Sequence, residues 1–244
     1  MDTDIFYAPH SDDETLSMGP AILRALRSSG SVYVLLLTDG VADETRQCLN
    51  GEFLCSWHKT YHDPQKENFQ DIPLDKAAFI RARRKEFLNA CSLMGVPRSR
   101  IKIYDYHDNH LSKENVKKIM KEMHQKADHS SRITHHSMSY YYDNHPDHLS
   151  CGESLLELCR EDETFNARWY VKKSYGKELS EENQVFSDAE KSPEGRKVLE
   201  EICREVYGKY DPERGKYAIG YHSVSNSFEA LQKAYTIQYH EIIK

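Results

Sequence analysis

The feature that most constrains this chain is the segment of residues 4–14, where a short apolar run ends abruptly in one histidine and three carboxylates. Residues 5–8 are typical of a buried strand, and a helical pattern begins directly after the acids. In an open α/β sheet, side chains at the carboxyl end of a first strand face the crevice that binds ligands. We therefore expect chemistry at the tip of the first strand.

Two of these side chains have the spacing of metal ligands. His10 and Asp13 lie three residues apart on a tight turn, so an imidazole nitrogen and a carboxylate oxygen can converge on one ion. Asp12 would face the same site without binding the metal. The alternative is helix capping, because acids are favoured in the first turn of a helix. This segment alone does not decide between the two.

A second cluster favours the metal. His145-Pro146-Asp147-His148 places two imidazoles around an acid, again directly before a helical pattern, over residues 149–159. Capping alone does not explain two His/Asp clusters at strand-to-helix junctions. Two ligands from the first cluster and one from the second would surround zinc and leave an open position for water.

Both clusters resemble signatures of the PIG-L/LmbE-like zinc-dependent de-N-acetylase family. The resemblance continues in order over roughly the first 160 residues and is weak in the last third. Its segments are Ala8-Pro9-His10-Ser11-Asp12-Asp13-Glu14-Thr15-Leu16, Thr38-Asp39-Gly40, Arg83-Arg84-Lys85-Glu86 with Gly95, Tyr106-His107-Asp108-Asn109-His110-Leu111 and His145-Pro146-Asp147-His148.

The resemblance implies a fold and an activity. The fold would be an α/β, Rossmann-like three-layer sandwich with a mostly parallel sheet and the site at the carboxyl ends of the strands. The activity would be hydrolysis of an N-acyl amide, chiefly N-acetyl, on an amino sugar or its conjugate. Family members act on N-acetylglucosamine linked to lipids, thiol precursors or antibiotics. The leaving group of this chain does not follow from the sequence.

The resemblance also implies roles for the first cluster and the end of the second. His10, Asp13 and His148 would bind Zn²⁺, or another divalent metal such as Fe²⁺. Bound zinc lowers the pKa of its water towards about 7 and polarises the acyl oxygen. Asp12 would be the general base that takes the proton of this water.

Four further residues have expected roles beside the metal. His145 would stand by the tetrahedral intermediate and protonate the departing amine, with Asp147 orienting it and raising its pKa. Arg83 and Asp108 would contact the substrate. For Arg83 the alternative is a surface ion pair with Glu86, and for Asp108 it is a turn.

Two rival functions stay open. The same chemistry could cleave a small amide without a sugar, or the chain could be a catalytically silent binding protein of the same fold. The presence of Asp12 and His145 argues against the binding protein, which needs neither a base nor an acid. Dinucleotide binding is disfavoured, because the first strand-to-helix turn lacks G-x-G-x-x-G and carries acids that repel a pyrophosphate.

Composition limits the possible partners. A net charge of -6, with 30% of residues charged and both signs interleaved, disfavours a nucleic-acid scaffold. No apolar run approaches the roughly 18 residues that span a bilayer, and the first residues do not resemble a signal peptide. We expect one deacetylase domain over residues 1–244, located in the cytoplasm, that takes a small-molecule substrate. Association into a homo-oligomer is left open.

Residues 41–75 break the pattern and are expected to form an insertion or lid loop near the site. His58 and His62, four residues apart, would share a helix face and could bind a second metal. The neighbouring aromatic residues favour an aromatic-rich loop with incidental histidines. Cys48 and Cys55 bracket a loop, but reduced thiols are expected in a chain without a secretory signal.

Elsewhere strands and helices alternate, which indicates a parallel sheet. Residues 177–192 are acidic and show no period. Strands are predicted over residues 5–8, 32–37, 101–104, 132–135 and 168–173, and helices over 21–26, 77–94, 112–127, 149–160, 198–207 and 228–237.

Overall fold

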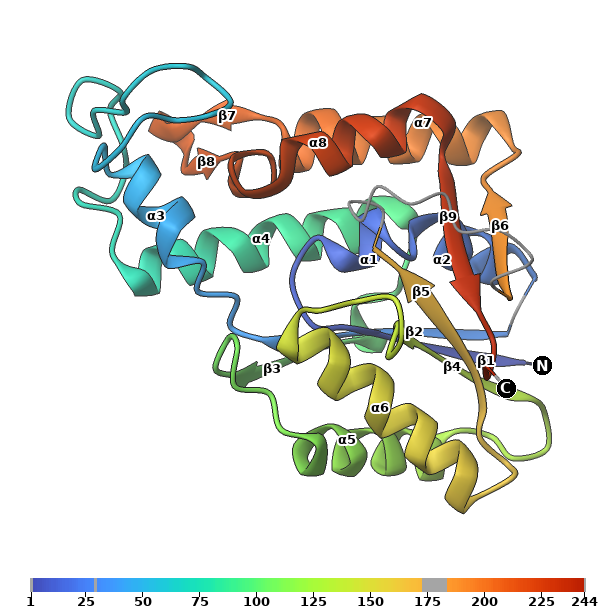
Figure 1. Cartoon of the computed structure of the whole chain (residues 1–244). Helices are drawn as coiled ribbons and strands as arrows, with labels where there is room; N and C mark the ends of the chain where they lie inside the picture. The colour runs from blue at the N-terminus through green and yellow to red at the C-terminus, as the bar shows by residue number, and fades with distance from the viewer. Residues whose placement is uncertain (1, 29, 173–183, 244) are drawn as a thin grey trace.

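The computed structural model describes residues 2–28, 30–172 and 184–243. Its centre is a seven-stranded sheet in the order β3-β2-β1-β4-β5-β9-β6 (Figure 1). The strands are β1 (Thr3–Ala8), β2 (Ser31–Thr38), β3 (Ile101–Tyr106), β4 (Ile133–Met138), β5 (Asn166–Val171), β6 (Val185–Ala189) and β9 (Thr236–His240). The first five strands are parallel, and β9 is antiparallel to both of its neighbours. The predicted mostly parallel, Rossmann-like sheet is confirmed.

Helices cover both faces of this sheet (Figure 1). On one face lie α5 (Lys113–Lys126) and α6 (Pro146–Glu161), and on the other α1 (Asp13–Leu16), α2 (Gly19–Ser28) and α4 (Lys76–Met94). Beyond α4 lie α7 (Pro193–Glu201), which continues as a π-helical segment (Ile202–Tyr207), and α8 (Ile219–Ala234). Short 3₁₀ helices span Arg98–Arg100 and Pro212–Arg214. No helix in the described part of the chain combines the length and apolar character needed to cross a membrane.

The central strands are buried on both faces. On β1, Ile5 and Tyr7 belong to the apolar core beneath α5 and α6, whereas Phe6 and Ala8 belong to the core beneath α2 and α4. Continuous apolar runs are the pattern of strands covered on both sides. The strand order reverses at β1, which pairs with β2 on one side and β4 on the other. The carboxyl ends of β1 and β4 therefore flank a topological switch point, where such sheets bind ligands.

Helix α4 begins and ends at clear signals. The Asp75 side chain accepts a hydrogen bond from the backbone N–H of Ala78, and Gly95 ends the helix with φ +93°. Along this helix Phe79, Phe87 and Ala90 are buried, whereas Leu93 is 39% exposed.

The C-terminal third departs most from the sequence predictions. The helix predicted over residues 228–237 starts earlier, at Ile219, and gives way to β9 at Thr236. Within residues 177–192, predicted to lack structure, β6 forms an edge strand, and residues 177–183 lie outside the described part of the chain. The added strands extend the sheet beyond the family-like region.

Residues 41–75 start with a helix, α3 (Asp43–Leu49), and continue as turns. They pack beside a small two-stranded sheet of β7 (Tyr210–Asp211) and β8 (Lys216–Tyr217) (Figure 1). A third apolar core joins this segment to α4 and to the start of α8; it includes Leu49, Phe69, Leu74, Phe79, Tyr217 and Ile219. The segment is thus anchored to the body of the protein.

Candidate active site

The turn between β1 and α1 carries the first cluster. Asp12 has φ +146°, a backbone conformation that residues other than glycine rarely adopt. The surroundings hold it there: its backbone N–H donates to Glu14 Oε2 at 2.9 Å, and its carbonyl accepts from Leu16 at 2.8 Å. The backbone N–H of His10 donates to Asp13 Oδ2 at 2.9 Å. Strained residues held by their surroundings are common at functional sites.

Three predicted metal ligands converge from the two clusters. His10 Nδ1 lies 3.1 Å from His148 Nε2 and 3.3 Å from Asp13 Oδ2, and the latter two atoms are 3.2 Å apart. Ligands of a tetrahedral zinc ion, with bonds of 2.0–2.1 Å, lie about 3.3 Å from one another. The three atoms therefore form one face of a coordination tetrahedron, and its fourth position is free of these side chains.

The other nitrogen of each histidine is engaged by carboxylates. His10 Nε2 lies 3.1 Å from Asp147 Oδ2 and 3.0 Å from Asp108 Oδ1, and His148 Nδ1 lies 2.7 Å from Asp143 Oδ2. An ionised carboxylate only accepts hydrogen bonds, so these nitrogens carry the protons. His10 Nδ1 and His148 Nε2 are then unprotonated and face each other beside Asp13. This is the arrangement by which carboxylates orient metal-binding histidines.

The charges around the triangle of His10 Nδ1, Asp13 Oδ2 and His148 Nε2 favour a cation. Burial opposes protonation of His148, yet Asp13 and Asp143 raise the pKa of this imidazole. Burial likewise raises the pKa of the Asp13 carboxyl, but His148 and His10 hold it well below its usual range. Buried carboxylates that attract protons onto neighbouring histidines provide the negative potential that a divalent cation would satisfy. The residues present therefore fit a zinc ion.

Asp12 and Arg83 are neighbours within this site. Arg83 is buried, its Nη2 lies 3.4 Å from Asp12 Oδ2, and its Nε donates to Ser11 Oγ at 3.1 Å. Arg83 Nη1 donates to the carbonyl of Gly40, which has φ +64°. Burial raises the pKa of Asp12, and Arg83 opposes this effect. The alternative of an exposed Arg83–Glu86 pair is wrong, because the buried Glu86 instead accepts hydrogen bonds from the start of α8.

Asp147 does not act on His145 as expected. Its carboxylate contacts His10 Nε2 and accepts the backbone N–H groups of Asn109 at 2.7 Å and Leu111 at 3.0 Å. His145 Nδ1 instead accepts the backbone N–H of Asp147 at 3.3 Å. Burial, with His10 and then His148, lowers the pKa of His145 to about 4, although Asp147 opposes this shift. Asp147 thus raises the pKa of His145, but burial and the two neighbouring histidines outweigh its effect.

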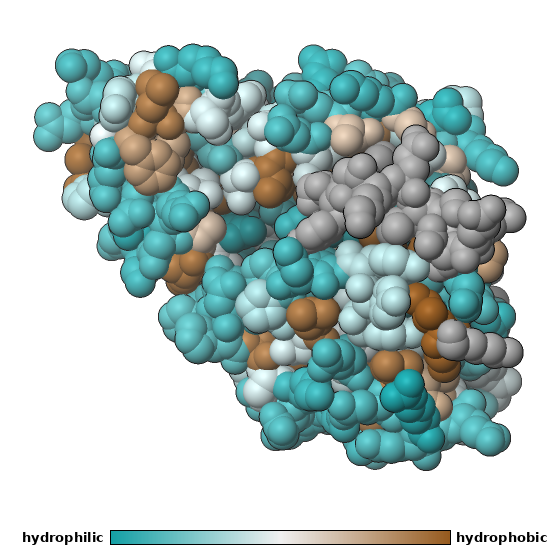
Figure 2. All heavy atoms as spheres, viewed as in Figure 1, coloured by the Kyte–Doolittle hydropathy of each residue, from teal (hydrophilic) through white to brown (hydrophobic). Residues whose placement is uncertain are grey.

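A cavity of about 210 Å³ opens beside the triangle. Figure 2 shows this face of the molecule hollowed between the α5/α6 layer and the lobe that holds residues 41–75, with hydrophilic residues along the hollow. Ala42, at the start of that segment, lines the cavity. Six of the predicted site residues line this cavity: His10, Asp12, Asp13, Arg83, Asp108 and His145. The other two, Asp147 and His148, are buried beneath this lining.

Sequence reasoning missed several groups of this site. Lys172 lines the cavity directly after β5, and the rule that used the carboxyl ends of strands could have identified it. Ser223 and Ser227 line the cavity from α8, and no local sequence motif identifies them as site residues. Asp143, which holds His148, precedes the second cluster by two residues.

Comparison with known proteins identifies a family. The family model of PIG-L, described as GlcNAc-PI de-N-acetylase, matches residues 5–159, which is more than half of the chain. This range contains both His/Asp clusters and all eight predicted site residues. None of the curated proteins is significantly similar in sequence.

Solved structures share the fold at low identity. A deacetylase triple mutant of the teicoplanin biosynthetic pathway is 16% identical, with a TM-score of 0.60 over 98% of this chain and 97% of that one. N,N'-diacetylchitobiose deacetylase from Pyrococcus horikoshii is 17% identical, with a TM-score of 0.55 over 94% and 76%. The 4-carboxy-2-hydroxymuconate hydratase from Pseudomonas putida is 12% identical, with a TM-score of 0.53 over 100% and 97%. Because this fold also carries a hydratase, function has to be argued from the site.

Proposed function

The chain belongs to the PIG-L family of de-N-acetylases, and from this premise we propose that it is a metal-dependent hydrolase that removes an acetyl group from the nitrogen of an amino sugar or amino-sugar conjugate. The observation that carries this proposal is the triangle of His10 Nδ1, Asp13 Oδ2 and His148 Nε2, with the Asp12 carboxylate in the same cavity. A ligand set with an open position and a buried carboxylate beside it is the equipment of metal-assisted hydrolysis.

The metal would be held by His10, Asp13 and His148. Zinc bound there supplies a Lewis acid that polarises the acyl oxygen and lowers the pKa of water. Asp143 and Asp147 keep the protons of the two imidazoles on the nitrogens that point away from the triangle. The chain thereby presents two neutral nitrogens and one carboxylate, the set that suits zinc.

Asp12 is the proposed general base. Burial raises its pKa, which increases its affinity for the proton of the attacking water, and Arg83 keeps it oriented. The Asp12 carboxylate contacts Arg83, whereas the Asp13 carboxylate contacts His10 and His148, so the two neighbouring carboxylates can serve different purposes.

His145 is the proposed donor on the side of the departing amine. Its Nδ1 accepts the backbone N–H of Asp147, so a neutral ring carries its proton on Nε2. That N–H can stabilise the negative charge that develops on the acyl oxygen, while the departing amine takes the proton that Asp12 removed from the water. This route works with the neutral imidazole that the low pKa implies.

Polar groups around the rest of the cavity suit a sugar. Asp108 offers a carboxylate, Lys172 an ammonium group, and Ser223 and Ser227 offer hydroxyls. Such groups are the partners that sugar hydroxyls require when they leave water. Asp108 and Arg83 are thus proposed substrate-binding residues.

The proposal can be tested by measuring amine release from a panel of N-acetylated amino sugars, their conjugates and non-sugar N-acetyl amines. Asp12→Asn should lower turnover by about 10²–10⁴-fold. Asp2→Asn makes the same chemical change at an exposed position near the other end of β1 and should leave turnover unaltered. Release from non-sugar amides alone would refute the sugar specificity, and silence across the panel with metal bound would refute the hydrolase.

A further inference from the structure

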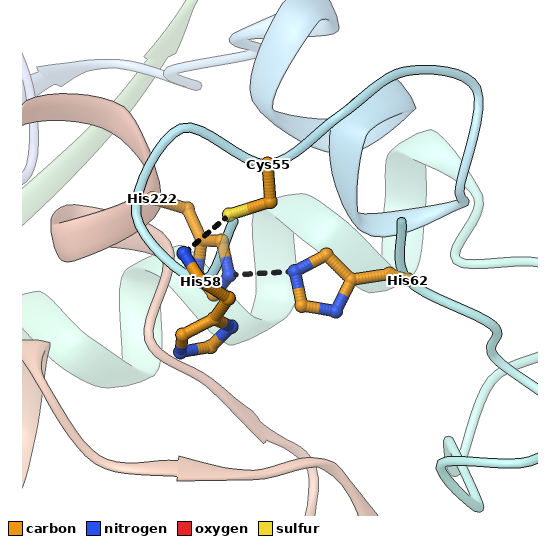
Figure 3. Close-up of side chains that lie close together, drawn as sticks. All are labelled: Cys55, His58, His62 and His222. Atoms are coloured by element: carbon orange, nitrogen blue, oxygen red, sulfur yellow. Dashed lines mark hydrogen bonds between the residues drawn. The ribbon is translucent and has the colours of Figure 1, made fainter. Parts of the chain in front are cut away.

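A second group of metal-binding side chains lies outside the candidate active site (Figure 3). Cys55, His58, His62 and His222 each offer one ligand atom, and these four atoms all lie within 4.8 Å of one another. The first three residues come from one loop of the segment of residues 41–75, and His222 comes from α8. Cys55 and His62 are buried, and His58 is half-buried.

We propose that Cys55, His58, His62 and His222 form a second metal site that binds a structural zinc ion. One thiolate with three imidazoles is a soft donor set of the kind that selects zinc. Four protein ligands complete a tetrahedron and leave no position for water, which distinguishes structural from catalytic zinc sites.

Hydrogen bonds leave two of the imidazoles ready for a metal. His62 Nδ1 lies 3.0 Å from Glu67 Oε2, and His222 Nδ1 lies 2.9 Å from the carbonyl oxygen of Ala218. Both oxygens accept hydrogen bonds, so each Nδ1 carries the proton and each Nε2 is bare. A carboxylate or carbonyl behind each imidazole is the usual support of metal-binding histidines.

The two bare nitrogens face each other. The Nε2 atoms of His62 and His222 are 3.1 Å apart, which is close to the separation of about 3.3 Å between two nitrogen ligands of one zinc ion. Without a cation, two lone pairs at this distance repel each other. A metal ion between them turns this unfavourable contact into two bonds.

The loop also prepares the thiol. Cys55 Sγ accepts the backbone N–H of His58 at 3.2 Å, a hydrogen bond that stabilises a thiolate (Figure 3). Two backbone hydrogen bonds close the loop, from Cys55 N–H to the carbonyl of Thr60 at 2.8 Å and from Lys59 N–H to the carbonyl of Cys55 at 2.9 Å. The resulting order, Cys55-x₂-His58-x₃-His62, has the short spacings typical of zinc-binding loops.

Gly51 lets His62 take its place. Gly51 has φ +81°, and a Cβ atom there would lie 2.2 Å from the carbonyl oxygen of His62. Any side chain at this position would push the backbone of His62 away from the cluster. The backbone of the loop is therefore shaped to bring His62 to its partners.

A zinc ion at this place would couple the loop to the active-site wall. His222 directly precedes Ser223 and Val224, which line the cavity, and Ala42 lines it from the other end of the loop segment. The metal would hold residues 41–75 against α8 and so fix the shape of the cavity. The interpretation of His58 and His62 as incidental is revised here, because their partner His222 lies 160 residues beyond His62.

Cobalt substitution distinguishes the second site from the first, because only the second contains a thiol ligand. Co²⁺-loaded protein should show a sulfur-to-cobalt charge-transfer band that persists in His148→Ala, which lacks a ligand of the first site. The band should vanish in Cys55→Ser and remain in Cys159→Ser, which alters a thiol outside the cluster. A wild-type protein with no such band, or with Cys48 and Cys55 joined in a disulfide, would overturn the proposal.

A second measurement does not depend on the folding of Cys55→Ser. X-ray absorption of zinc bound to His148→Ala protein should report one sulfur and three nitrogen ligands. Zinc bound only through nitrogen and oxygen would overturn the proposal. Neither readout involves turnover, so failure of the second site and failure of the proposed hydrolase would be distinguishable.

Discussion

Asp143 Oδ2 lies 2.7 Å from His148 Nδ1, so one carboxylate fixes the tautomer of a proposed metal ligand without touching the metal. Partners of this kind typically contribute 10–100-fold to metal affinity. Asp143→Asn should therefore weaken zinc at the first site by about that factor, as measured by competition with a chelator. Asp2→Asn is the matched control. Unchanged affinity in Asp143→Asn would show that the Asp143 carboxylate does not support His148 as a metal ligand.

Asp12 and His148 should separate chemistry from metal binding. Asp12→Ala should retain zinc and lose most of its turnover, because its carboxylate lies outside the ligand triangle. His148→Ala should lose zinc from the first site together with turnover, because it removes one of the three ligands. Metal content and amine release measured on the same preparations test both statements. Near-normal turnover of zinc-loaded Asp12→Ala would exclude Asp12 as the base.

Gly51→Ala should destabilise the protein and remove zinc from the second site. The cost of placing alanine at φ +81° is on the order of 1–3 kcal/mol, and the contact with the His62 carbonyl adds to it. Gly95→Ala is a sharp control: Gly95 also has positive φ, +93°, but a Cβ there meets nothing within 4 Å. Chemical unfolding should show the larger loss of stability in Gly51→Ala. Zinc analysis should show loss of the second zinc ion in Gly51→Ala and not in Gly95→Ala. Equal zinc content in both variants would contradict the link between Gly51 and His62.

The sequence indicates that the two clusters lie together, because the signals for their positions are local. His10, Asp12 and Asp13 follow one strand directly, and His145 and His148 lie in the turn and first helical residues after another, so periodicity and spacing suffice to bring the two clusters together. Helix α4 was equally readable, because Asp75 and Gly95 mark its ends. These predictions needed only neighbours in the chain and the rule that parallel strands align their carboxyl ends.

Long-range contacts and unusual helix ends could not be predicted from the sequence. No pattern links His222 to His62, because only the packing of α8 on the loop brings them together. Helix α8 ends at Tyr235 in a left-handed conformation, φ +49°, without the glycine that usually marks such an end. The alternation after Tyr235 is that of a strand, and it was read as a continuation of the helix. The sequence prediction therefore misses strand β9, which lies between β5 and β6.

Glu67→Gln should weaken zinc at the second site without disturbing the first. Its carboxylate supports His62 at Nδ1 and also accepts a hydrogen bond from Tyr210. Loss of this support should reduce zinc affinity by about 10–100-fold. Glu44→Gln, which makes the same change at an exposed position on α3, is the control. The intensity of the thiolate band during cobalt titration measures the effect, and an unchanged titration would show that Glu67 does not position His62.

His240 should make folding stability depend on pH. The ring is fully buried on β9, and its Nε2 lies 2.7 Å from Ser139 Oγ. Burial lowers the pKa of His240 from its ordinary value of 6.5 to about 4. Between these two values the unfolded chain binds a proton that the folded protein does not, so stability is present above pH 6.5 and is lost as the pH falls towards 4.

Replacing this histidine should remove its share of the pH dependence. Unfolding free energies of the wild type should fall by up to about 2 kcal/mol more than those of His240→Gln between pH 6.5 and pH 4.5, because each pKa unit corresponds to about 1.4 kcal/mol. The comparison uses the slope with pH, since glutamine also alters the contact with Ser139 at every pH. His129→Gln, which changes an exposed ring, is the control and should keep the wild-type slope. Parallel slopes for all three proteins would mean that His240 is protonated in the folded state as readily as in the unfolded chain.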